Sequence, residues 1–266
     1  MNRSEKIEYL NNKKEFNFQD LCLITELLRS EGGCPWDMEQ THESIRKDFI
    51  EETYEVVEAI DNKDVELLRE ELGDVLLQVA FHTRIEEEQG NFVMGDVTTG
   101  ICAKLIHRHP HVFGDVTAET SEKVLQNWDK IKNEEKQRET VTSRLRSVPP
   151  SLPALMKAAK VGKRASCFDF PDAASAFLKI KEECGEVEEA MLEESNLEEE
   201  IGDLLFSVAN FARKSGIDPE TALINATKKF IDRFEMIENE AIKHNKNVEK
   251  MSQKELDELW ELKKHQ

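Results

Sequence analysis

The amino-acid sequence predicts an all-α protein that consists of two tandem homologous helical units. Only 11 glycines and 7 prolines interrupt its 266 residues, and long segments carry apolar residues at spacings of three and four. No segment shows the alternation of apolar and polar residues that is typical of a strand. The phrase EELGDVLLQV at positions 70–79 returns as EEIGDLLFSV at positions 199–208, which indicates an internal duplication.

The apolar spacing predicts five helices in each half of the chain. In the first half they cover residues 18–30, 43–61, 64–88, 95–108 and 119–137. In the second half they cover residues 153–166, 173–193, 196–215, 219–244 and 253–264. Two of these starts also carry capping signals. Asp218 followed by Pro219 is typical of an N-cap and a first helical residue, and Ser252 with Glu255 fits a capping box.

A polar and then proline-bearing stretch, NEEKQRETVTSRLRSVPPSLP at positions 133–153, separates two halves with matching helix orders. Such a composition is typical of a linker. We therefore predict a first helical domain over 18–138, a linker over 139–152 and a second helical domain over 153–266.

The duplication extends to a set of acidic residues. FIEETYEVVEA at 49–59 matches IKEECGEVEEA at 180–190 with an offset of 131, and the phrase quoted above follows at an offset of 129. Each half therefore reads E-E-x-x-E and then E-x-x-D. A fainter match pairs Lys104 and Arg108 with Lys229 and Arg233. The repeated acidic positions are Glu51, Glu52, Glu55, Glu71 and Asp74 in the first half, and Glu182, Glu183, Glu186, Glu200 and Asp203 in the second.

Helical geometry predicts that these acidic residues meet. Residues three or four apart share a helix face, and each acidic set borders an apolar arc. The arcs are Ile50, Tyr54, Val57 and Ile60 on one helix and Leu72, Val75, Leu76 and Val79 on the next. Burial of these arcs against each other would bring the carboxylates together. Like charges so close require a cation, and oxygen ligands suit Mg²⁺ or Mn²⁺.

The alternative interpretation is a solvated acidic helix face, which a single E-E-x-x-E in so acidic a chain would favour. Two half-motifs that each occur twice in register favour the metal site instead. Gly73 and Gly202 follow the acidic residues directly. Because glycine inside a helix costs about 1 kcal/mol relative to alanine, we expect a close approach of another segment at these positions.

Charge and composition exclude several classes of protein. The net charge of −19 argues against a nucleic-acid backbone as partner. Five dispersed cysteines without a C-x-x-C pair are typical of reduced thiols, which predicts a cytoplasmic protein. The polar N-terminus has no signal-peptide pattern, and no apolar run approaches the roughly 20 residues that span a bilayer.

At this point the residues resemble a known family. The E-E-x-x-E and E-x-x-D pattern is similar to the metal-binding signature of the all-α nucleoside triphosphate pyrophosphohydrolases. The duplication, GGCPWD at 32–37, KLIHRHPHVFGD at 104–115, NW at 127–128 and LPAL at 152–155 resemble the two-domain form of the MazG family. The resemblance runs from about Leu21 to the C-terminus.

The resemblance implies hydrolysis of nucleoside triphosphates to a monophosphate and pyrophosphate, with broad base specificity and a housekeeping role in nucleotide pools. It also implies a homodimer. The ten repeated carboxylates would hold Mg²⁺, or Mn²⁺ in its place. Glu51 or Glu182, the offset member of each pair, would take a proton from the attacking water.

The resemblance further implies that Asn225, Lys229 and Arg233 contact the nucleotide, and that Trp260 lies against its base. Glu182, Lys229 and Arg233 are then the candidate catalytic residues. The first half has Gly100 where Asn225 would align, so we predict that the second half is the catalyst. Asn225, Lys229 and Arg233 could instead belong to an ordinary polar helix face, and Trp260 could be a core anchor.

Two rival functions remain open at this stage. A phosphoribosyl-ATP or dUTP pyrophosphohydrolase would explain one unit but not GGCPWD or HRHPHVF. A helical regulatory or interaction protein with a decayed site would explain the fold without catalysis. His107, His109 and His111 alternate around Pro110, which interrupts a helix, so we expect a structural turn there and no zinc site.

Overall fold

The computed structural model describes residues 1–117, 120–135 and 140–263, and within these ranges it contains helices and no strand. The prediction of an all-α protein with two tandem units is confirmed. The chain divides into two compact units, Met1–Lys132 and Asn133–Gln266. No described helix is long and apolar enough to cross a membrane.

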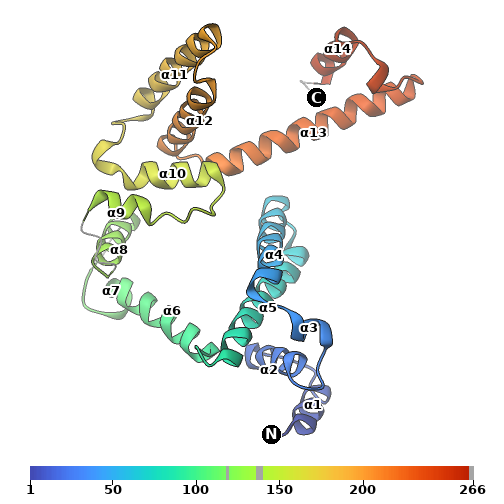
Figure 1. Ribbon diagram of the computed structural model, residues 1–266, viewed down its shortest axis with the longest axis vertical. Coiled ribbons are helices and arrows are strands. Elements are labelled where there is room, and N and C mark those ends of the chain that lie inside the picture. Colours follow the sequence, from blue (N-terminus) through green and yellow to red (C-terminus); the bar gives the residue numbers. More distant parts are fainter. Residues whose placement is uncertain (118–119, 136–139, 264–266) are drawn as a thin grey trace. The chain divides into compact units, whose positions relative to one another are not determined.

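The first unit contains helices α1 to α7 and all but the last turn of α8 (Figure 1). They are α1 (Arg3–Asn11), α2 (Phe18–Arg29), α3 (Pro35–Glu39), α4 (His42–Asn62), α5 (Val65–Gln89), α6 (Met94–Arg108), α7 (Pro110–Phe113) and α8 (Ser121–Glu135). The second unit contains α9 (Val141–Arg146), α10 (Ala154–Arg164), α11 (Ala173–Glu193), α12 (Leu197–Lys214), α13 (Pro219–Lys243) and α14 (Gln253–Lys263). Two short 3₁₀ turns cover Ser166–Phe168 and Val248–Lys250.

All ten predicted helices are present, within one or two residues at every end that the structure describes. The predicted helix ends at residues 119, 137 and 264 lie outside the described residues, as do the domain limits at 138, 139 and 266. The limits 18–138, 139–152 and 153–266 stay a prediction. Part of the predicted linker, Val141–Arg146, is helical.

The first unit is organised around the α4–α5 hairpin. Lys63 in the left-handed conformation ends α4, and Asp64 caps α5 by accepting hydrogen bonds from the amides of Glu66 and Leu67. At the other end of the hairpin, His42 of α4 contacts two residues of α5. Its Nδ1 atom is 2.7 Å from Nδ1 of His82, and its Nε2 atom is 2.6 Å from Oε1 of Glu86. These contacts and caps fix the position of α4 along α5.

The second unit repeats this plan with the α11–α12 hairpin. Buried alanines, Ala176 and Ala190 on α11 and Ala209 on α12, allow a close approach of the two helices. α10 crosses α12 where Gly162 meets Asn210. α13 contacts α10 and α12 near its start and then runs away from the hairpin (Figure 1), and α14 folds back on it.

The prediction that the apolar arcs of the two first-unit helices bury each other is wrong. Ile50, Tyr54, Val57 and Ile60 on α4 are 36–56% exposed, and Leu72 and Leu76 on α5 are 51% and 40% exposed. Val75 and Val79 are half-buried. The buried apolar cluster between the two helices consists instead of Ile45 on α4 and Phe81 and Ile85 on α5, with Leu77 packed against it, and Ala59 and Glu71 are also buried. Periodicity identifies a common face, but it does not say which neighbour covers that face.

Candidate metal and nucleotide site

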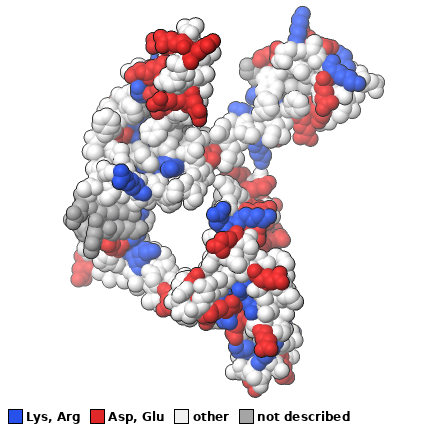
Figure 2. All heavy atoms as spheres, in the orientation of Figure 1, with Lys and Arg blue, Asp and Glu red and all other residues white. Residues whose placement is uncertain are grey.

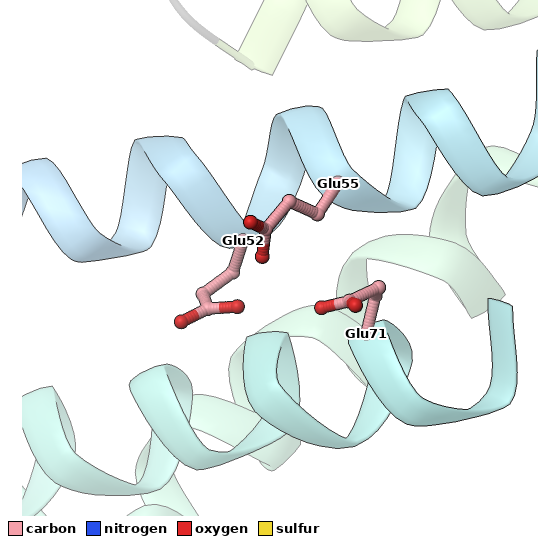
Figure 3. A group of neighbouring side chains, drawn as sticks. All are labelled: Glu52, Glu55 and Glu71. Atoms are coloured by element: carbon pink, nitrogen blue, oxygen red, sulfur yellow. The ribbon is translucent and has the colours of Figure 1, made fainter. Parts of the chain in front are cut away.

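The first-unit carboxylates meet between the two helices of the hairpin. Glu52 and Glu55 on α4 and Glu71 on α5 point toward one another (Figure 3), and one oxygen of each lies within 4.8 Å of the others. Residues 52 and 55 share a face because they are one turn apart. The loop at Lys63 and Asp64 then places the first turns of α5 opposite the second half of α4, which brings Glu71 to the same place.

The carboxylates of the first-unit cluster repel one another and are partly shielded from solvent, which raises the pKa of two of them. Burial and then the charges of Asp74, Glu55 and Glu71 raise the pKa of Glu52 to about 7. Burial also raises the pKa of Glu71, with the neighbouring Glu55 as the next cause. Both pKa values are raised because burial and neighbouring negative charges disfavour the charged carboxylates. A cation among these oxygens would therefore stabilise the charged forms.

The second-unit carboxylates meet at the equivalent place on the α11–α12 hairpin. Oxygens of Glu183, Glu200 and Asp203 lie within 4.8 Å of one another. Acidic residues gather over the end of this hairpin where α11 ends and α12 begins (Figure 2). The prediction that residues from E-E-x-x-E and E-x-x-D come together thus holds for three residues in each half. The exposed Glu51 and Glu182 and the half-buried Asp74 and Glu186 lie outside these two groups.

Glu183 has the most informative environment of these carboxylates. Its exposed fraction is 4%, and no described residue donates a hydrogen bond to its Oε2 atom. Its Oε1 atom is 2.9 Å from Nζ of Lys179. A buried carboxylate oxygen without a donor is costly, and two further carboxylates face it. A divalent cation with oxygen ligands fits this donor set.

The predicted nucleotide residues lie on α13 and α14, and no described contact joins them to the carboxylates. Asn225 and Lys229 are exposed on α13. Arg233 lies over the ring of Trp260, with Cζ 5.8 Å from the ring centroid. The same ring packs against Phe230 at 5.1 Å between centroids. The structure thus brings Arg233 and Trp260 together, one turn of helix beyond Lys229.

Two residues near these groups were not predicted from the sequence. Lys179 interacts with three of the second-unit glutamates, and its spacing of three and four from Glu182 and Glu183 was a usable signal. Trp128 lies beside Arg108, with Cζ 5.7 Å from the ring centroid, just as Trp260 lies beside Arg233. The Arg–Trp pair therefore belongs to the duplication, although the two tryptophans differ in their spacing from the arginine.

The histidine-rich segment forms a turn, as expected. α6 ends at Arg108 and α7 begins at Pro110, with Nδ1 of His109 2.6 Å from the carbonyl oxygen of Leu105. Among the described residues, these histidines do not join a cluster that could hold a metal ion. Gly73 and Gly202 do not behave as expected, since an added Cβ would meet no atom of the described chain within 4 Å.

Comparison with known proteins gives a consistent result. The MazG nucleotide pyrophosphohydrolase domain matches this chain twice, at residues 40–113 and 172–237. The chain is 45% identical, over 92% of its length and 94% of the relative's, to "Nucleoside triphosphate pyrophosphohydrolase/pyrophosphatase MazG" of Thermotoga maritima. It is 40% identical, over 92% of its length and 96% of the relative's, to "Nucleoside triphosphate pyrophosphohydrolase" of Escherichia coli K12. It is also 45% identical, over 89% of its length and 49% of the relative's, to "Uncharacterized protein YabN" of Bacillus subtilis.

Proposed function

Because this chain belongs to the MazG family of nucleotide pyrophosphohydrolases, we propose that it hydrolyses nucleoside triphosphates to a monophosphate and pyrophosphate. The observation that carries the proposed site is the buried, unpartnered Oε2 atom of Glu183 beside Glu200 and Asp203. The decayed-site alternative is disfavoured, since both carboxylate clusters are intact.

The proposed metal ligands of the second unit are Glu183, Glu200 and Asp203, with Glu186 adjacent to them and Glu182 at the exposed edge. The first-unit equivalents, in the same order, are Glu52, Glu71, Asp74, Glu55 and Glu51. We propose Mg²⁺ as the ion, with Mn²⁺ as a substitute, because all candidate ligands are carboxylate oxygens. When bound, Mg²⁺ would offset the charge of the triphosphate and position it for attack by water.

Glu182 is the proposed general base. Its side chain is 61% exposed and lies next to Glu183 in sequence but outside the group of converging oxygens. It can therefore accept a proton from water while its neighbour serves as a ligand. Lys229 and Arg233 would bind phosphate oxygens, Asn225 would contact the nucleotide, and the Trp260 ring would stack on the base. Stacking reads the aromatic face and not the base edge, which supports a broad base specificity and a housekeeping role.

A homodimer would bring these two halves of the site together. The α13 residues do not reach the carboxylates of their own hairpin in the described contacts, and α13 exposes Leu223, Phe230, Ile231 and Phe234 by 41–60%. Such an apolar helix face is expected to be covered. We propose that α13 of a second copy covers an exposed hairpin face and carries its Lys229 and Arg233 to the carboxylates. We further propose that the enzyme acts in the cytoplasm.

The test combines metal removal with product analysis. We expect no turnover in EDTA, restoration by Mg²⁺ or Mn²⁺, and monophosphate and pyrophosphate as products on ion-exchange chromatography. Pyrophosphate and orthophosphate should be measured separately, because the name of the Thermotoga relative includes a pyrophosphatase activity. Full activity without metal, or a nucleoside diphosphate as the product, would contradict the proposal.

A further inference from the structure

Lys179 lies beside the proposed metal site of the second unit and shares one of its carboxylates, Glu183. Its Nζ atom is 2.8 Å from Oε1 of Glu182, 2.9 Å from Oε1 of Glu183 and 3.9 Å from Oε2 of Glu186. Lys179 is on α11, one turn before Glu182 and Glu183 and two turns before Glu186, and its side chain is only 32% exposed. One ammonium group thus forms ion pairs with three of the five second-unit carboxylates that the repeat aligns.

The first unit carries the opposite charge at this position. At the offset of 131 that aligns the two E-E-x-x-E motifs, the residue that corresponds to Lys179 is Asp48. Asp48 lies on α4 three and four residues before Glu51 and Glu52, so helical spacing places it on the same face as these glutamates. The aligned acidic residues are the same in both units, but the residue one turn before them is negatively charged in the first unit and positively charged in the second.

We propose that Lys179 is an internal counter-ion that competes with the divalent cation for the second-unit carboxylates. In the absence of metal, the ammonium stabilises the close glutamates. A divalent ion that takes Glu183 as a ligand must displace this ammonium or bind beside it, and either case weakens metal binding. The second unit therefore binds a divalent cation more weakly than the first, and it fills only at higher metal concentration. This inference rests on the proposed metal site.

The alternative role for Lys179 is to position Glu183. The ion pair with Oε1 would hold the Glu183 side chain in place and leave its buried Oε2 atom available to a metal ion. The two roles predict opposite signs. Loss of the ammonium strengthens metal binding if Lys179 competes, and weakens it if Lys179 positions the ligand. We favour competition, because repulsion between an ammonium and a divalent ion a few ångströms away outweighs the ordering of one side chain.

The experiment measures binding of Mn²⁺ alone by calorimetry, in a full-length chain whose first-unit site is disabled by Glu52→Gln and Glu71→Gln. In this background we expect Lys179→Met to lower the Kd for Mn²⁺ at least tenfold. Lys179→Arg keeps the positive charge and should leave the Kd within about twofold, which also controls for folding. Circular dichroism should show the same helix content for all chains.

The reciprocal exchange uses the first unit, with the second-unit site disabled by Glu183→Gln and Asp203→Asn. Here Asp48→Lys should raise the Kd at least tenfold, whereas Asp48→Asn should raise it less. An unchanged or higher Kd in Lys179→Met would overturn the competition while leaving the metal site intact. A background chain that binds no Mn²⁺ at the second unit would overturn the proposed metal site and this inference with it.

Discussion

The two oxygens of Glu183 show how one side chain can serve two purposes. One oxygen forms an ion pair with Lys179, and the other is buried with no donor among the described residues. The sequence shows that Glu183 belongs to a repeated acidic motif, but only the packing of α11 on α12 shows that it is the buried member. Its first-unit equivalent, Glu52, lacks such a lysine, and its titration should reveal the difference.

The first prediction at this scale concerns Glu52 in metal-free protein. Its pKa is raised from 4.5 to about 7 in the folded state, so the folded chain binds a proton that the unfolded chain has lost. Stability from this group is therefore present below about pH 4.5 and is lost as the pH rises toward 7. In EDTA at pH 8, Glu52→Gln should melt at a higher temperature than wild type, because it lacks the disfavoured charge. At pH 5 the difference in melting temperature between the two proteins should be smaller.

The matched control for this prediction is Glu51→Gln, which changes an exposed neighbour on the same turn. It should follow the wild-type melting temperature across the whole pH series. Equal pH dependence in wild type and Glu52→Gln would show that this carboxylate does not hold a proton near neutral pH.

At the scale of helices, the crossing of α10 and α12 has little tolerance. A Cβ atom at Gly162 would overlap the Oδ1 atom of Asn210. Asn210 is only 3% exposed, and its Oδ1 atom accepts a hydrogen bond of 3.1 Å from Arg213. We expect Gly162→Ala to destabilise the second unit by about 1–3 kcal/mol, as measured by urea unfolding. The control is Gly100→Ala on α6, where an added Cβ meets nothing within 4 Å.

The control should leave stability unchanged or raise it by up to about 1 kcal/mol, since alanine favours a helix more than glycine does. A Gly162→Ala chain as stable as wild type would mean that Asn210 can move aside without cost and that the crossing is loosely packed.

The long helices could be predicted from the sequence because each carries several turns of apolar periodicity. α3, α7 and α9 were missed because helices of four to six residues have too few turns to show a period. α1 was missed because it buries no residue and so has no apolar face. The carboxylate clusters were predictable from spacing, and so was the contact of Lys179 with Glu182 and Glu183 on the same helix. The contact of Trp128 with Arg108 required the packing of one helix on another.

At the scale of the whole molecule, each unit has a small core. The buried apolar residues include six alanines and few large side chains, while dozens of large apolar residues are more than a third exposed. We therefore expect a homodimer at micromolar concentration. Sedimentation equilibrium should give about twice the chain mass of 30.6 kDa, and a monomer would contradict the proposed assembly of the site.

The central claim is that the second unit carries out the hydrolysis. The most direct measurement is the rate of pyrophosphate release by Glu183→Gln and Glu52→Gln at saturating Mg²⁺, since each change removes one charge from one cluster. The loss of a charged contact in a catalytic site costs about 10²–10³ in rate. We predict such a loss for Glu183→Gln, and for Lys229→Ala, with most activity kept by Glu52→Gln. A greater loss in Glu52→Gln than in Glu183→Gln would assign the catalysis to the first unit.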